Sequence, residues 1–123
     1  MTTLADSFVK ECKMRLLEVK RDLLNRVRNS RMEFQMLDKS GGDEADQTMS
    51  LLAENDYLSA QQRLKEQLLE IELALARIEN GTYGICEETE EAIEFDRLRA
   101  LPWTRLSIEG AEIREAMRRK FAR

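Results

Sequence analysis

Two long runs of apolar residues at helical spacing constrain the fold of this chain more than any other feature of its sequence. The first covers residues 4 to 37 without a glycine or proline, and the second runs from about Asp46 to about Glu79. In both, the apolar positions recur at intervals of three and four, which is typical of helices that pair along a narrow seam, as in a coiled coil or a helical hairpin. The predicted seam positions are Val9, Cys12, Leu16, Val19, Leu23, Val27, Ser30, Phe34 and Leu37 in the first helix, and Tyr57, Gln61, Leu64, Leu68, Ile71, Leu75 and Ile78 in the second.

A short glycine turn separates the two predicted helices. Gly41 and Gly42 release the backbone, and Asp43 or Asp46 is suited to cap the start of the second helix. Asn80-Gly81 provides the signal that ends it. Because two helices of similar length with a short connection fold back antiparallel, we predict that residues 1–80 form an N-terminal segment and a hairpin, with the hairpin tip at about residues 38–48.

The character of the sequence changes after Gly81. A β-favouring stretch covers residues 82–86, Pro102 precedes Trp103, and a last helix is predicted from about Ser107 to Phe121. Residues 81–123 are expected to form a small globular region that packs with the N-terminus as one unit. Its predicted core is Leu4, Phe8, Tyr83, Ile85, Ile93, Leu98, Trp103, Ile113 and Met117. The predicted fold class is mainly α: a long antiparallel coiled-coil hairpin on a small globular region with a C-terminal helix.

Charge and composition argue against several classes of function. The net charge of −4 is unfavourable for binding the phosphates of DNA or RNA. The chain has no histidine for catalysis or metal ligation, and its two cysteines are too few for a disulfide scaffold. No stretch approaches the roughly 20 apolar residues of a membrane span, and the first residues do not resemble a signal peptide. We therefore expect a cytoplasmic protein that binds no membrane.

Basic residues gather in the last quarter of the chain, and two interpretations of them stay open. They are Arg97, Arg99, Arg105, Arg114, Arg118, Arg119, Lys120 and Arg123. Either they belong to a solvated helix with favourable cations near its C-terminus, or they contact an acidic surface of a partner.

Three phrases of the sequence carry a resemblance to a known family. Arg77-Ile-Glu-Asn-Gly-Thr-Tyr-Gly-Ile-Cys86 is followed by Arg97-Leu-Arg-Ala-Leu-Pro102 and then by Ala111-Glu-Ile-Arg-Glu115. In their order and spacing these phrases resemble the DksA/TraR family of bacterial transcription factors. The resemblance covers most of the chain. It implies a long coiled-coil hairpin on a zinc-finger-like domain, and a non-enzymatic protein that binds RNA polymerase rather than specific DNA.

The chain departs from this family at the zinc site. The resemblance implies two Cys-x-x-Cys pairs, but the first pair falls on Cys86 and Thr89 and the second on Ser107 and Gly110. One thiolate remains where a closed structural zinc site needs about four ligands. We therefore expect a degenerate, zinc-independent variant with no metal and no other cofactor, in which packing supplies the lost stabilisation. Cys86 itself is interpreted as a structural remnant rather than a redox sensor.

The acidic hairpin tip is the second site that the resemblance singles out. The active tip of the family reads Asp-x-x-Asp-x-Ala, which Asp43 and Asp46 match, while Thr48 replaces the alanine. The resemblance implies that this tip reaches into the secondary channel of RNA polymerase. The alternative is that both aspartates only cap the second helix, although capping and function are compatible.

The resemblance also bears on guanosine tetraphosphate, the alarmone of the stringent response. Positions that are basic in family members hold Glu70, Leu101 and Ala111 here, while Arg63 keeps its charge. We therefore expect any response to the alarmone to be weakened or absent.

Taken together, the sequence predicts a monomeric regulator that binds RNA polymerase directly and modulates initiation. The alternative is a structural or adaptor hairpin for another protein partner, in which case substitutions at the tip would be silent. Gly41-Gly42-Asp43-Glu44 also spells most of the diguanylate cyclase signature. That chemistry needs a large α/β domain, and a hairpin tip supplies no pocket for a substrate.

Overall fold

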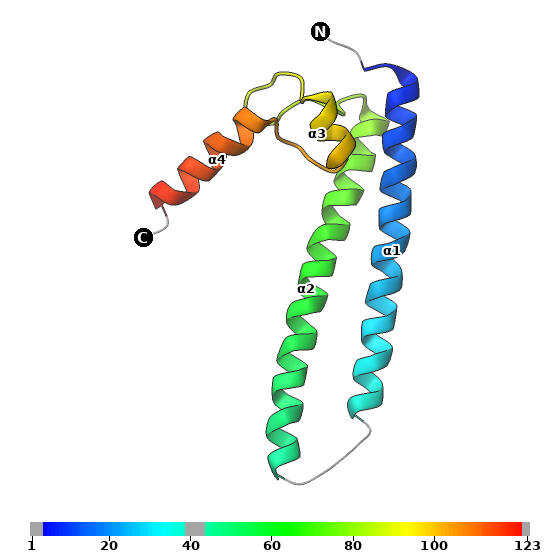
Figure 1. Cartoon of the computed structure of the whole chain (residues 1–123), viewed down its shortest axis with the longest axis vertical. Coiled ribbons are helices and arrows are strands. Elements are labelled where there is room, and N and C mark those ends of the chain that lie inside the picture. The colour runs from blue at the N-terminus through cyan, green and yellow to red at the C-terminus, as the bar shows by residue number, and fades with distance from the viewer. Residues whose placement is uncertain (1–3, 39–43, 122–123) are drawn as a thin grey trace. The chain divides into compact units, whose positions relative to one another are not determined.

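The computed structural model describes residues 4–38 and 44–121, with side chains described for residues 4–36 and 47–121. In that part of the chain the elements are α1 (Asp6–Asp38), α2 (Glu44–Asn80), α3 (Phe95–Ala100) and α4 (Ile108–Phe121), shown in Figure 1. The mainly α fold, with a helical hairpin, a small globular region and a C-terminal helix, is confirmed. The short helix α3 was not predicted.

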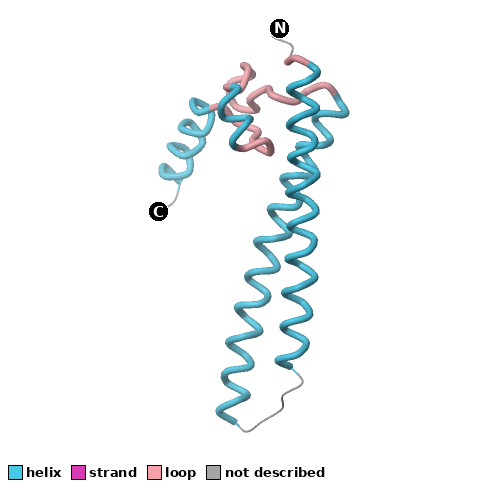
Figure 2. The backbone as a smooth tube through the Cα atoms, turned by 45° about the vertical axis from the view of Figure 1, so that its right-hand side comes forward, coloured by secondary structure: helices cyan, strands magenta, loops and turns pink. Residues whose placement is uncertain are grey.

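The chain divides into two compact units. One contains Met1–Glu18 together with Glu70–Arg123, and the other contains Val19–Leu69. Each of the long helices therefore contributes residues to both units. Figure 2 shows that the loops of the described residues lie mainly between the end of α2 and the start of α4.

The Val19–Leu69 unit consists of the facing parts of α1 and α2. The rings of Phe34 and Tyr57 stack with their centroids 4.3 Å apart and an interplanar angle of 10°. Gln61 donates a hydrogen bond from Nε2 to the carbonyl oxygen of Val27 at 3.3 Å. A later residue of α1 thus meets an earlier residue of α2, so the two helices run antiparallel. The predicted seam positions of both helices are all buried or half-buried, apart from Leu37, whose side chain lies outside the described residues.

The other unit holds the larger core. Its buried apolar side chains come from α1, α2, the loop after α2, and α3: they are Phe8, Cys12, Leu16, Ile71, Ala74, Tyr83, Cys86, Ile93 and Leu98. Phe8 and Phe95 meet edge to face with ring centroids 5.1 Å apart. The guanidinium of Arg99 lies 5.8 Å from the centre of the Phe8 ring, and Arg15 donates a hydrogen bond to the carbonyl of Arg99, so α1 and α3 are joined by aromatic, cation–π and polar contacts.

The end of α2 and the following loop are shaped by glycines and by backbone hydrogen bonds. Gly81 has a φ of 76°, and the N–H of Thr82 bonds the carbonyl of Arg77 at 2.9 Å, which closes the helix as predicted. The stretch 82–86, predicted to favour β structure, forms only an isolated bridge between Ile85 and Ala92. Within the described residues, no helix combines the length and the apolar character needed to cross a membrane.

The prediction that Ile113 and Met117 belong to the core is wrong. Ile113 is 37 % exposed and Met117 is 50 % exposed. Both lie on α4, whose one buried residue is Gly110. The physical reason is that α4 contacts the rest of its unit through Gly110 and through the ion pairs of Arg114 with Glu87 and Glu88, so its apolar side chains are left at the surface. Tyr83, Ile93 and Leu98 are buried as predicted.

Candidate functional site

The four positions predicted to be a degenerate zinc site come together in the structure. We call Cys86, Thr89, Ser107 and Gly110 the four-position cluster. The Sγ atom of Cys86 accepts hydrogen bonds from the backbone N–H of Thr89 at 3.5 Å and from the hydroxyl of Ser107 at 3.4 Å. The N–H of Gly110 donates to Ser107 Oγ at 3.0 Å. Cys86 is fully buried, so these hydrogen bonds satisfy a sulfur atom that no water reaches.

A tight loop places Cys86 and Thr89. The N–H of Cys86 bonds the carbonyl of Glu91 at 2.8 Å, and the N–H of Glu90 bonds the carbonyl of Cys86 at 2.9 Å. Glu90 adopts a φ of 60°, a left-handed conformation that turns the chain back on itself. The N–H of Glu87 then bonds the carbonyl of Arg105 at 2.9 Å, which joins this loop to the segment before α4.

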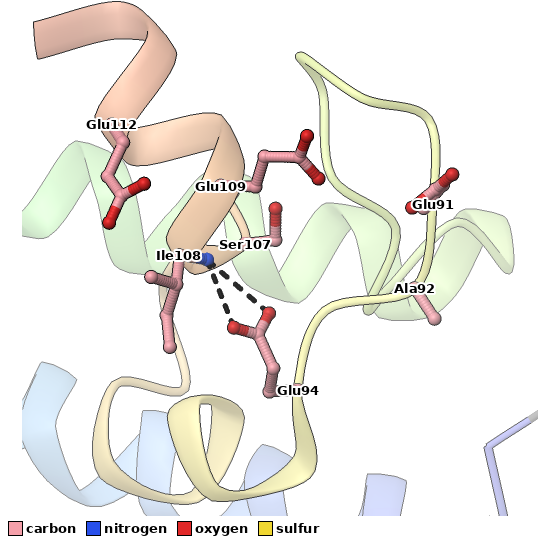
Figure 3. A pocket seen from close by; sticks show the side chains of 7 residues that line it. All are labelled: Glu91, Ala92, Glu94, Ser107, Ile108, Glu109 and Glu112. Carbon is pink, nitrogen blue, oxygen red and sulfur yellow. Dashed lines mark hydrogen bonds between the residues drawn. The ribbon is translucent and has the colours of Figure 1, made fainter.

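The start of α4 places the other two positions. Ser107 precedes the helix, and its hydroxyl accepts the N–H of Gly110, which is the hydrogen bond expected of an N-cap serine. The carboxylate of Glu94 accepts the N–H of Ile108 at 3.1 Å, as drawn in Figure 3. Two of the orphan N–H groups of the first turn, those of Ile108 and Gly110, are therefore satisfied by side chains from two different segments.

The four-position cluster is so tightly packed at Gly110 that it leaves no room for a side chain there. A Cβ atom built at this position would overlap Cys86 Sγ, and it would lie 3.3 Å from Ser107 Oγ and 3.3 Å from Glu88 Cβ. The glycine is thus required by close packing against the sulfur atom, not by its backbone conformation.

The cluster does not fit a zinc ion. A structural zinc site takes four ligands, with Zn–S distances of about 2.3 Å, whereas the cluster offers one thiol, two hydroxyls and a glycine. The sulfur atom is packed against the backbone of α4 at the position where a fourth ligand would stand. Within the described residues, no group of three or more His, Cys, Asp or Glu side chains is arranged to hold a metal ion.

The hydrogen bonds shift the pKa of Cys86. Burial of the thiol raises its pKa, but hydrogen bonds from Ser107 and Thr89 outweigh burial and lower it to about 6. The thiolate is therefore favoured in the folded protein near neutral pH, although no solvent reaches the sulfur atom.

This lowered pKa has a consequence for stability. In the unfolded chain a cysteine pKa is about 8.5, so the folded state binds its proton less tightly than the unfolded state does. The stabilisation is full above about pH 8.5 and is lost as the pH falls through 6. We expect the stability difference between a Cys12→Ser chain and a Cys12→Ser/Cys86→Ser chain to grow from pH 5 to pH 9, measured by urea unfolding. A difference independent of pH would contradict the lowered pKa.

An acidic hollow of about 410 Å³ lies beside the cluster. Its lining includes the carboxylates of Glu91, Glu94, Glu109 and Glu112, as Figure 3 shows. Glu94 uses both of its oxygens to bond the N–H of Ile108. The hollow thus borders the start of α4, and its negative charge is partly used to cap that helix.

Of the three predicted tip residues, the structure describes the side chain of Thr48 but not those of Asp43 and Asp46. Asp43 is outside the described residues, and Asp46 lies in the first turn of α2 with its side chain outside the description. Thr48 is exposed on α2. Their role at the tip therefore stays a prediction.

The four positions linked to the alarmone have different surroundings in the structure. Glu70 forms an ion pair with Arg105, while Leu101 and Ala111 are half-buried and Arg63 is exposed. The hydrogen bond that Arg105 donates to the carboxylate of Glu70 raises the pKa of Arg105. Glu70 thus serves a contact within its own unit.

Comparisons with known proteins agree on one family. The model of the prokaryotic dksA/traR C4-type zinc finger matches residues 81–116. The RNA polymerase-binding transcription factor DksA of Caulobacter vibrioides (strain NA1000 / CB15N) is 34 % identical over 107 residues, covering 87 % of this chain and 75 % of the relative. The chain thus matches most of the length of this relative.

Solved structures give the same result. Transcription factor DksA2 from Pseudomonas aeruginosa matches with a TM-score of 0.85 and 31 % identity, over 93 % of this chain and 88 % of that one. The RNA polymerase binding protein and transcriptional regulator Dks from Chlamydia trachomatis matches with a TM-score of 0.56 and 24 % identity, over 92 % of this chain and 93 % of that one. The second match supports the fold alone.

Proposed function

Because this chain belongs to the DksA/TraR family, we propose that it regulates transcription by binding RNA polymerase directly. The observation that carries the proposal is the similarity over most of the chain to proteins described as RNA polymerase-binding transcription factors. The proposed action is cytoplasmic, non-enzymatic and monomeric, without base-specific contact to DNA. Residues 1–80 supply the hairpin, and residues 81–123 supply the base that packs with the N-terminus.

The finer mechanism we propose is insertion of the hairpin tip into the secondary channel of the polymerase, where it modulates initiation. A pair of helices is slender, because its seam is a single row of side chains from each helix. The stacked pair Phe34 and Tyr57 and the hydrogen bond of Gln61 hold the two helices together in the Val19–Leu69 unit. Asp43, Asp46 and Thr48 are the residues proposed to contact the polymerase.

We further propose that the protein works without zinc. The support is chemical and steric: one thiol of the four ligands is present, and Gly110 brings helix backbone against Cys86 Sγ. The alarmone guanosine tetraphosphate is proposed to have little effect, because Glu70 presents a negative charge that is already paired with Arg105.

Purified polymerase provides the direct test of the proposed function. The native chain is expected to bind polymerase and to change both the lifetime of promoter complexes and the transcript yield from a ribosomal-type promoter. If the chain binds neither core enzyme nor holoenzyme and leaves transcription unchanged, the proposal is wrong. Binding without any transcriptional effect would favour the structural or adaptor hairpin instead.

Zinc independence leads to a separate expectation. The chain purified from zinc-containing medium should carry well below one zinc per molecule by metal analysis. Its thermal unfolding midpoint should be the same with and without a strong chelator, because no metal-binding free energy is coupled to folding. A stoichiometric zinc content, or a large drop of the midpoint on chelation, would contradict this part of the account.

A further inference from the structure

The position of α4 is not fixed by an apolar face. Its buried residue is Gly110, while Ile108, Met117 and Phe121 are 50 %, 50 % and 77 % exposed. An amphipathic helix is normally held by the apolar stripe that it buries. Since α4 buries so little, other contacts must decide whether it stays against the rest of its unit.

A continuous chain of ion pairs supplies those contacts. We call Glu70, Glu87, Glu88, Arg105 and Arg114 the ion-pair network. Arg114 on α4 reaches Glu88 at 3.0 Å and Glu87 at 3.5 Å. Glu87 also lies 3.8 Å from Arg105, and Arg105 pairs with Glu70 on α2. The network therefore connects α4 to the loop after α2, to the segment before α4, and to α2 itself.

The network ties together the same segments that hold the four-position cluster. Glu87 and Glu88 stand between Cys86 and Thr89 in the loop, and Arg105 and Arg114 flank Ser107 and Gly110. In a C4-type zinc finger a metal ion would join two such segments through its ligands. Here the ion pairs of Arg114 join the loop to α4, in addition to the hydrogen bond from Ser107 to Cys86 Sγ.

Burial of the network is intermediate. Its side chains are between 27 % and 39 % exposed, unlike the pair of Arg119 and Glu115 within α4, which is 77 % and 58 % exposed. Exposed pairs contribute little one at a time, and charges that share partners in a network contribute more. Because water still reaches these side chains, dissolved salt screens them.

We propose that the ion-pair network is a salt-sensitive clamp that holds α4 against the loop around Cys86, with Arg105 and Arg114 as its positioning residues. At low ionic strength the clamp is closed and α4 is docked. At high ionic strength the clamp opens and α4 is released locally, while the apolar core of the unit stays folded. This inference concerns the chain alone and does not depend on binding to RNA polymerase.

Amide hydrogen exchange of the full chain is a suitable measurement. A released helix of 14 residues is marginal in water by itself, so its amides would exchange once the clamp opens. The Debye length falls from about 30 Å at 0.01 M to about 3 Å at 1 M salt. Over this range of sodium chloride we expect the protection of α4 to fall roughly five- to tenfold, with unchanged protection at Leu16 and Ile71.

Two variants separate the clamp from a general effect of salt. Arg114→Gln removes the network member that lies on α4, together with its ion pairs to Glu87 and Glu88, so α4 should exchange quickly already at low salt and respond little to more salt. Glu115→Gln removes a carboxylate of α4 outside the network and should behave like the native chain. The proposal is overturned if native α4 exchange does not depend on salt, or if the core amides lose protection equally. It is also overturned if Glu115→Gln acts like Arg114→Gln.

Discussion

Replacing Gly110 by alanine is expected to lower the free energy of unfolding by up to about 2 kcal/mol, although it adds a better helix former to α4. Helix propensity alone favours alanine over glycine by about 1 kcal/mol. Against this, the new methyl group would overlap Cys86 Sγ and stand 3.3 Å from Ser107 Oγ. Overpacking a tight site typically costs about 1–3 kcal/mol, and the overlap involves a sulfur atom that is fully buried and cannot swing into solvent. The steric term should therefore exceed the gain in propensity.

A double variant tests the stated cause. Cys86→Ala removes the sulfur atom, so adding Gly110→Ala to that background should cost less than it does in the native chain. Glu109→Ala, at the neighbouring exposed position of α4, controls for helix propensity. Urea unfolding monitored by circular dichroism gives the free energies. A Gly110→Ala chain more stable than the native chain would contradict the tight packing of the four-position cluster.

The largest functional effect is expected from Asp46→Asn at the hairpin tip. The substitution keeps the size of the side chain and removes its charge, so it should leave the hairpin folded while most of the transcriptional effect disappears. Hydrogen bonds to charged groups contribute about 1.5–3 kcal/mol, which corresponds to a loss of roughly ten- to hundredfold. The readout is the change in promoter-complex lifetime at a concentration of the variant that saturates polymerase binding.

The matched control is Asp56→Asn, which removes the same charge from an exposed position further along α2. This variant should act like the native chain. Polymerase binding by Asp46→Asn should persist, because the rest of the hairpin is unchanged. If Asp46→Asn and Asp56→Asn are both fully active, the tip carboxylate has no functional role and only caps α2.

Local pattern was enough to predict the long helices and their seam. Burial every three or four residues repeats along α1 and α2, and residues such as Leu16 and Ile71 are nearly inaccessible, as that period requires. The resemblance to the family, through its two Cys-x-x-Cys pairs, also pointed to four positions that lie together in the structure: Cys86, Thr89, Ser107 and Gly110.

The features that were not predicted from the sequence depend on contacts between residues that are far apart in the chain. Helix α3 has six residues, and no side chain caps its first residue. It forms because Leu98 is buried and the N–H of Leu101 bonds the carbonyl of Arg97, and neither fact is visible in local propensity. Met117 is 50 % exposed on a helix whose buried residue is Gly110, and the apolar spacing of α4 alone does not show which of its residues pack.

The ion-pair network also joins residues that are far apart in the sequence, so it could not be predicted from local pattern. Glu70 and Arg105 are far apart in sequence. From the sequence alone, charged residues of this kind are as consistent with a solvated surface as with ion pairs. The sequence suggested two readings for the basic residues of the last quarter, solvation or an acidic partner. For Arg105 and Arg114, the structure shows acidic partners within the same unit.

Site-specific photo-crosslinking from the hairpin tip to RNA polymerase tests whether the tip enters the secondary channel. A photoreactive residue at position 48, which is exposed on α2, reports which polymerase segments lie beside the tip, and excess native chain serves as the competitor. We expect competitor-sensitive crosslinks to segments that line the secondary channel. Crosslinks confined to the outer surface of the polymerase, or no crosslink under conditions where the labelled chain binds, would contradict it.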